Sequence, residues 1–112
     1  MTQEVYLEEL RSGAAMKFAD LMELIEDNFD HTPAPFINGT LENSENENQG
    51  SAKLFGFAII HQLTPLETLH CFGEHYQAVL NDPQGTAHQN IRNFITYGWE
   101  GLQFKSSALV KK

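Results

Sequence analysis

The sequence predicts one mainly helical domain, an α+β fold dominated by helix, built as a compact bundle of about five or six helices with a small β element. Apolar residues recur at the three- and four-residue spacing of amphipathic helices along most of the chain. Capping and turn signals divide the chain into short segments. With 112 residues and 41% hydrophobic content, the chain can form one core but not two, so we expect residues 1–112 to be a single domain.

The first third of the chain predicts two amphipathic helices, or one helix bent at Gly13. Helical spacing relates the apolar residues within 5–10 and again within 18–29. Segment 31–36 contains two prolines, each of which lacks a backbone donor and forces the residue before it toward an extended conformation. We therefore expect the chain to turn there.

The small β element is predicted from two short segments. Asn38-Gly39 is a tight-turn signal because both residues tolerate a positive φ, and Phe36 and Leu41 flank it as short strands. The alternation of Leu102, Gln103 and Phe104 is typical of another short strand, which we expect to pair near Phe36.

The middle of the chain predicts a loop followed by a buried helix. Residues 42–50 contain only Glu, Asn, Ser, Gln and Gly, so they offer nothing apolar to bury and predict a mobile loop. Ser51 is expected to cap the segment that follows. Leu54–Ile60 is apolar on every side, which indicates burial, and we favour a helix over a strand for it.

Three more helices are predicted toward the C-terminus. Thr64-Pro65-Leu66-Glu67 combines a capping box with proline at the first helical position, so a helix should begin at Pro65 and end near Gly73. A second helix covers residues 74–80. Thr86-Ala87-His88-Gln89 repeats the capping-box pattern and should open a third helix that Gly98 closes, with Ile91, Phe94 and Ile95 facing inward.

The charge distribution limits the classes of partner. Residues 1–47 carry eleven of the fifteen carboxylates, and the net charge is −8. An acidic surface repels phosphate backbones and anionic lipids, so we expect neither nucleic-acid nor membrane binding. No apolar run approaches the length of a membrane-spanning helix, and the polar start Met1-Thr2-Gln3-Glu4 does not fit a classical signal peptide. We therefore expect a soluble protein that is not exported by the classical route.

Cys71 is the one potential nucleophile with recognisable helpers, His70 and His75 nearby and His88 on the next helix. Cys71 lies near the C-terminal end of the helix predicted to begin at Pro65, where the helix dipole opposes a thiolate. A buried structural cysteine is therefore the favoured interpretation. Cys71 and His75 are four residues apart, but Gly73 lies between them and no second pair has a zinc-site spacing. We therefore predict no metal and no cofactor.

The most informative polar segment is the expected helix start at His88. Three and seven residues separate His88 from Ile91 and Ile95, so His88 is expected to share their inward face as a neutral imidazole. The candidate ligand-binding residues are His88, Gln89, Asn90, Arg92, Asn38 and Cys71. The alternative is that this cluster is an internal hydrogen-bonded pin between helix and loop, since buried polar groups are usually satisfied structurally.

Several segments together are similar to the HopJ family of type III effector-like proteins. They are Pro33, Phe36–Gly39, Asn48–Lys53, Thr68–Gly73, His88–Phe94 and Gly98–Gly101. The resemblance covers nearly the whole chain and implies a protein of the bacterial cytoplasm, an effector delivered into a host cell through a type III apparatus. It implies no particular biochemical activity and supplies no catalytic residues.

Three functional hypotheses follow from the residues and the resemblance. The first is a HopJ-like protein that binds a protein partner or a small ligand beside His88. The second is a small hydrolase-type enzyme in which Cys71 or His88 acts as nucleophile or base. The third is a non-secreted housekeeping protein whose acidic front half meets a basic partner. The sequence does not predict the oligomeric state.

Overall fold

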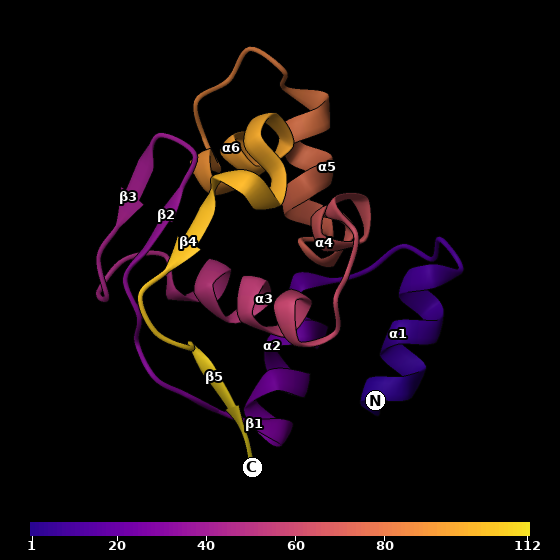
Figure 1. Cartoon of the computed structure of the whole chain (residues 1–112). Helices are drawn as coiled ribbons and strands as arrows, with labels where there is room; N and C mark the ends of the chain where they lie inside the picture. The colour runs from indigo at the N-terminus through magenta and orange to yellow at the C-terminus, as the bar shows by residue number, and fades with distance from the viewer.

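The computed structural model describes residues 1–112 and confirms the predicted fold class (Figure 1). The helices are α1 Gln3–Arg11, α2 Phe18–Asn28, α3 Gln49–Ile60, α4 Pro65–Cys71, α5 Glu74–Asn81, α6 Gln89–Tyr97 and the 3₁₀ helix η1 Gly98–Gly101. The strands are β1 Phe29–His31, β2 Phe36–Asn38, β3 Leu41–Asn43, β4 Leu102–Phe104 and β5 Leu109–Lys111.

Helix α3 lies at the centre of the molecule, where α2, α4 and β5 pack against it (Figure 1). Its apolar side chains point in several directions because neighbours surround it. The fully buried ones are Ala52, Leu54, Phe55, Phe57 and Ala58. The predicted helix over residues 54–60 is confirmed, but its burial ends at Ala58, since Ile59 is 50% and Ile60 47% exposed.

The three-stranded sheet has β2 in the middle, antiparallel to both β3 and β4. Phe36 stands opposite Phe104, so the predicted pairing of these two segments is confirmed. Gly39 in the turn between β2 and β3 has φ +62°, and a Cβ atom there would overlap the Tyr97 ring. The turn therefore requires glycine for its conformation and for the close approach of α6.

The second sheet, in which β1 pairs antiparallel with β5, was not predicted. Phe29 was expected to continue the second helix, but α2 ends at Asn28 and Phe29 begins β1. Its ring remains buried in the core. The apolar position was therefore identified correctly and its backbone conformation was not.

The prediction of one loop over residues 42–50 is wrong at both ends. Residues 42 and 43 belong to β3, and α3 begins at Gln49 rather than after Ser51. Gln49 is held by its side chain, whose Oε1 accepts from Ala34 N at 3.1 Å and whose Nε2 donates to Ala34 O at 3.2 Å. A side-chain amide that pairs with a backbone peptide group extends the ordered region without any apolar burial.

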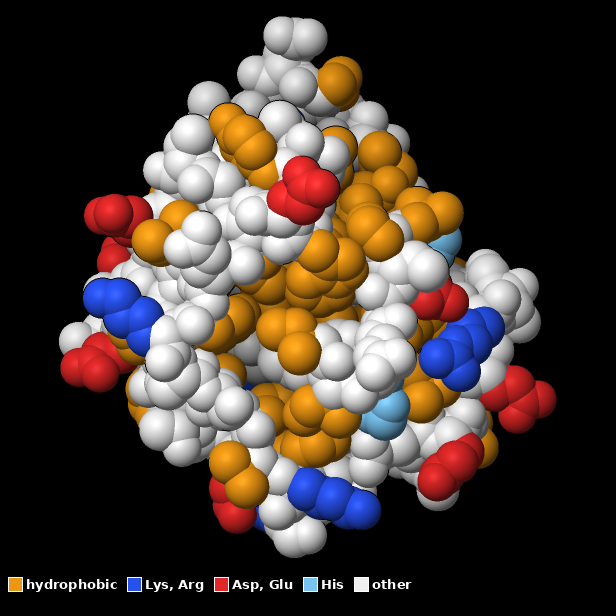
Figure 2. Space-filling view, in the orientation of Figure 1, with side chains coloured by type: hydrophobic (Ala, Val, Ile, Leu, Met, Phe, Trp, Pro, Cys, Tyr) orange, Lys and Arg blue, Asp and Glu red, His pale blue; other side chains and the backbone are white.

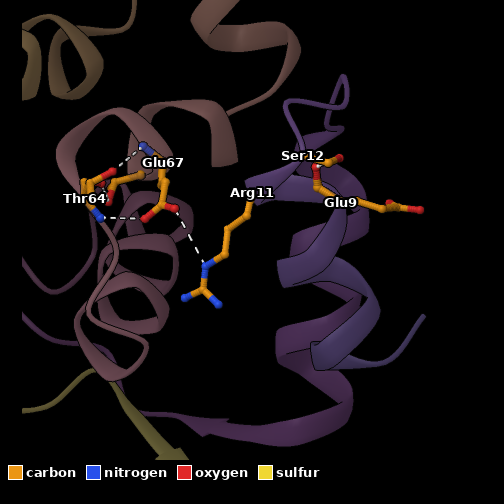
Figure 3. A network of polar contacts seen from close by, with 6 residues as sticks. Glu9, Arg11, Ser12, Thr64 and Glu67 are labelled. Atoms are coloured by element: carbon orange, nitrogen blue, oxygen red, sulfur yellow. Dashed lines mark hydrogen bonds and ion pairs between the residues drawn. The ribbon is translucent and has the colours of Figure 1, made fainter.

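One of the two predicted capping boxes is present. Thr64 Oγ1 accepts from Glu67 N at 3.1 Å, and Glu67 Oε1 accepts from Thr64 N at 2.9 Å, so α4 begins as expected (Figure 3). The same Glu67 side chain lies 3.7 Å from Arg11 Nε and links α4 to α1. The second predicted box is wrong, because Gln89 donates its side-chain amide to Thr86 O and α6 begins at Gln89.

Hydrophobic side chains gather near the centre of the face that presents α3 and the C-terminal strands (Figure 2). Gly56, Ile59 and Ile60 of α3 and Ala108 and Leu109 of the C-terminal segment line an apolar groove of about 340 Å³ there. Its lining contains no ionisable side chain, so it offers contact surface and no acid–base chemistry. No helix combines the length and the apolar character needed to cross a bilayer.

Candidate functional site

A cavity of about 510 Å³ lies where the first turns of α3 and α6 meet. Its polar lining comes from Asn48, Ser51, His75, His88, Gln89 and Asn90, and its apolar lining from Phe18, Leu41, Phe72 and Ile91, with Gly50 between them. A concave surface with an apolar part and a few convergent polar groups is the usual form of a small-molecule site. We therefore treat this cavity as the candidate functional site.

His88 precedes the first helical residue of α6 and adopts a left-handed conformation, with φ 59° and ψ 51°. Because it lies outside the helix, the helical spacing that related it to Ile91 does not apply, and its side chain is exposed. The prediction of a buried, inward-facing His88 is wrong for this reason. Ile95 is likewise 47% exposed, whereas Ile91 and Phe94 are buried as expected.

The rings of His75 and His88 lie side by side, with their centroids 5.1 Å apart. Phe18 contacts His75 edge to face at a centroid distance of 5.1 Å. Glu74 Oε1 lies 3.6 Å from His75 Nε2 and accepts from Phe18 N at 3.2 Å. Helix α5, the start of α2 and the segment before α6 thus together place two imidazoles on one wall of the cavity.

A cluster of four asparagine side chains adjoins the cavity, and three of them, Asn38, Asn43 and Asn90, are buried. Asn38 Nδ2 donates to Asn90 O at 2.8 Å and to Asn90 Oδ1 at 3.0 Å. Asn90 Nδ2 donates to Asn43 Oδ1 at 3.0 Å, and Asn48 Nδ2 donates to the same oxygen at 2.7 Å. The cluster joins β2, β3, the start of α3 and the start of α6, so it fixes the two helix starts relative to each other.

The structure brings three of the six predicted candidates to the cavity, namely His88, Gln89 and Asn90. Asn38 lies behind it, fully buried and bonded to Asn90. Arg92 binds the preceding loop instead, since its Nε donates to Ala87 O at 2.6 Å and its Nη1 donates to Pro83 O at 3.5 Å. Arg92 therefore holds the approach to α6 in place.

Sequence reasoning missed four residues of this region: Asn43, Asn48, Ser51 and His75. Asn43 and Asn48 fell in the segment interpreted as a loop. Ser51 was expected only to cap a helix. The sequence indicated His75 only as a possible partner of Cys71. Asn48 and Ser51 could have been identified from segment Asn48–Lys53, which is one of the segments that resemble the family and contains the first turn of α3.

Cys71 is fully buried between helices and does not line the cavity. Burial raises the pKa of its thiol to about 12, although the neighbouring Tyr6 hydroxyl favours the thiolate to a smaller extent. Burial also raises the pKa of Tyr6, whose side chain is itself fully buried. A thiol in this environment suits a structural role better than a nucleophilic one.

We expect Cys71 to resist thiol reagents while the protein is folded. With a pKa of about 12, a thiol is a thiolate in only about 1 part in 10⁴ at pH 8, and here it is also inaccessible. Labelling with Ellman's reagent should therefore be at least about a thousandfold slower in buffer than in guanidinium chloride. Rapid labelling of the folded protein, judged folded by circular dichroism in the same sample, would revive the cysteine-hydrolase hypothesis.

No three side chains from His, Cys, Asp and Glu come together as a metal site. His31 hydrogen-bonds through Nε2 with Gln49 Oε1 at 3.3 Å, and His61 through Nε2 with Gln3 Oε1 at 2.9 Å. Burial lowers the pKa of both imidazoles. These two histidines are therefore half-buried and hydrogen-bonded within the fold, and neither lines the cavity that contains His75 and His88.

The fold and the cavity define a small, mainly helical α+β domain with a polar cavity at two helix starts. The chain belongs to the HopJ type III effector protein family, whose model matches residues 3–109. The crystal structure of VPA0580, a protein of unknown function, superimposes with a TM-score of 0.97 and 46% sequence identity. The match covers 100% of this chain and 95% of that one. No curated protein matches the chain.

Proposed function

We propose that this HopJ-family protein binds a small ligand in the cavity between α3 and α6. The observation that carries the proposal is the pair of imidazoles, His75 and His88, on one wall of a 510 Å³ cavity. The His75 ring is half-buried against Phe18, whereas the His88 ring is exposed and, unlike His31 and His61, has no hydrogen-bond partner in the protein. No hydrogen bond engages the side chain of His88, so its donor and acceptor are available to a ligand.

Binding has more support than catalysis at this site. A nucleophilic or general-base mechanism needs a group within hydrogen-bond reach of its partner and a third group that orients the base. Cys71 lies outside the cavity, and no hydrogen bond orients the His88 ring. The hydrolase alternative based on Cys71 or His88 is therefore the weaker proposal.

The test is a thermal-shift screen of metabolites on the wild type and on His88→Asn. Asparagine tolerates the left-handed conformation of this position, so the variant removes the ring and keeps the backbone. We expect the variant to keep its melting temperature within about 2 °C, because the side chain is exposed, and to lose the ligand-induced shift. His70→Asn, outside the cavity, should keep the shift.

Two results would count against ligand binding at this site. If His88→Asn loses about 2 kcal/mol of stability or more, the residue is a structural pin of the α6 start. If His88→Asn and the wild type respond alike to every compound that shifts either protein, the binding site lies elsewhere.

Delivery by a type III apparatus is proposed on the strength of the family match. Residues 1–20 contain α1, which buries Tyr6 and Leu10 in the core, so this segment is available to a secretion apparatus only in the unfolded chain. A reporter fused to residues 1–20 should be exported by a type III-competent strain and retained by a strain without the apparatus. Equal retention in both strains would favour the non-secreted interaction protein.

A further inference from the structure

The polar groups that line the cavity are neutral or able to become positive. They are two imidazoles, the amides of Asn48, Gln89 and Asn90, and the hydroxyl of Ser51. Although the chain carries fifteen carboxylates and a net charge of −8, none of the lining residues is Asp or Glu. A cation entering this cavity would meet no compensating charge in the lining, whereas an anion would meet several hydrogen-bond donors.

The paired imidazoles are the strongest argument for an anionic ligand. Their centroids lie 5.1 Å apart, so one small group beside the pair can contact both rings. An imidazole N–H donates to a carboxylate or phosphate oxygen more strongly than to a neutral acceptor. The ring pair therefore suits a ligand that carries such an oxygen.

The first turns of α3 and α6 also favour an anionic ligand. The side chains of their N-cap residues, Asn48 and His88, accept no hydrogen bond from the first-turn backbone N–H groups. The two helices have twelve and nine residues, and their partial positive ends meet at the cavity that holds the imidazoles.

The rest of the cavity suits an apolar body attached to the anionic group. Phe72 and Ile91 are buried below it, and Phe18 and Leu41 are partly exposed beside it. An inorganic anion alone would leave this surface in contact with water. The lining therefore favours an organic acid over a free inorganic ion.

We propose that the cavity binds a small organic anion, with its carboxylate or phosphate group against His75 and His88 and its apolar part against Phe18 and Phe72. This inference rests on the proposed ligand-binding function and names the ligand class. Glu74 is the carboxylate closest to the pair, 3.6 Å from His75 Nε2, and it lies outside the lining.

The ligand class is tested with probes of one shape and different charge. Benzoate and phenyl phosphate carry an anion on an aromatic ring, benzamide is neutral and benzylamine is a cation. At about ten times Kd, an anionic probe should raise the melting temperature of the wild type by about 5 °C. Benzamide and benzylamine should raise it by less than about 1 °C at the same concentration. The relative shifts with benzoate and phenyl phosphate distinguish the two anionic groups.

Two variants test the anionic character of the ligand independently of the choice of probe. Glu74→Gln keeps the acceptor for Phe18 N and removes a negative charge beside His75, so it should tighten benzoate binding about two- to threefold. The double variant His75→Gln, His88→Asn should weaken benzoate binding at least about tenfold. His70→Gln should leave the affinity unchanged.

The experiments distinguish an error in the proposed ligand class from an error in the proposed site. Benzamide shifts as large as those with benzoate, lost in the double variant, would overturn the anionic class and keep the site. Benzoate binding that survives the double variant, or no response to any probe, would overturn the anion site itself. Looser binding of benzoate by Glu74→Gln would also contradict it.

Discussion

Replacing Asn90 with alanine is expected to destabilise the protein by about 3 kcal/mol, because Asn90 is the centre of the buried amide cluster. Its Oδ1 accepts from Asn38 Nδ2 at 3.0 Å and from Asn43 Nδ2 at 3.3 Å, and its Nδ2 donates to Asn43 Oδ1 at 3.0 Å. All three side chains are at most 6% exposed. Alanine would leave the partner amides buried without these contacts, which costs more than losing a hydrogen bond at the surface.

The measurement is urea denaturation followed by circular dichroism, with Asn93→Ala as the matched control. Asn93 is on the same helix. Its Nδ2 donates to Gln89 O at 2.9 Å and its Oδ1 accepts from Thr40 Oγ1 at 3.3 Å, but both hydrogen bonds are exposed to solvent. The control should lose less than about 1 kcal/mol. Equal losses in the two variants would mean that burial of the amide cluster contributes little to stability.

The same cluster explains how the candidate site depends on the fold. Asn90 touches the cavity on one side and the β2–β3 hairpin on the other. A variant at Asn90 therefore changes both stability and binding. Variants at His75 and His88 are the ones that separate ligand binding from folding, because neither ring takes part in this amide cluster.

Local signals in the sequence predicted those elements whose ends are defined within a few residues. The capping box at Thr64 specifies the start of α4 through contacts between residues three apart. The Asn38-Gly39 signal predicted its turn to within one residue, since Asn38 ends β2 and Gly39 has the positive φ. Periodicity correctly placed the buried side of α6 at Ile91 and Phe94.

Non-local contacts decided what the sequence could not predict. β1 and β5 pair Phe29 with Lys111, eighty-two positions along the chain, and no local pattern specifies that choice. The start of α3 depends on Gln49 bonding to Ala34, fifteen residues earlier. The asparagine cluster likewise joins residues 47 and 52 positions apart.

His88 illustrates how a local signal can mislead. The Thr86–Gln89 pattern fits a capping box, which predicts a helix that includes His88 with its side chain on the inner face. In the structure Gln89 binds Thr86 O and Arg92 binds Ala87 O, which holds the chain outside the helix. Residues of this segment line the cavity, but the predicted inward direction of the His88 side chain is wrong.

Replacing Phe55 with alanine is expected to have the largest effect on stability, a loss of about 4 kcal/mol. Phe55 is fully buried at the middle of α3. Its ring centroid lies 5.1 Å from Phe94, 5.7 Å from Phe72, 6.0 Å from Phe36 and 6.4 Å from Trp99. One side chain thus connects α3 to α6, to the end of α4, to β2 and to η1.

The cost combines the lost transfer free energy of the ring with that of the cavity it leaves, which neighbours from four separate elements cannot easily fill. For a domain of this length, about 4 kcal/mol corresponds to a fall in melting temperature of about 15 °C, measurable by calorimetry. Ile59, one turn along α3 and 50% exposed, is the control, and Ile59→Ala should cost about 1 kcal/mol or less. A Phe55→Ala variant that melts within a few degrees of Ile59→Ala would show that the core closes around the missing ring, and that the fold does not depend on this aromatic contact for holding α3 and α6 together.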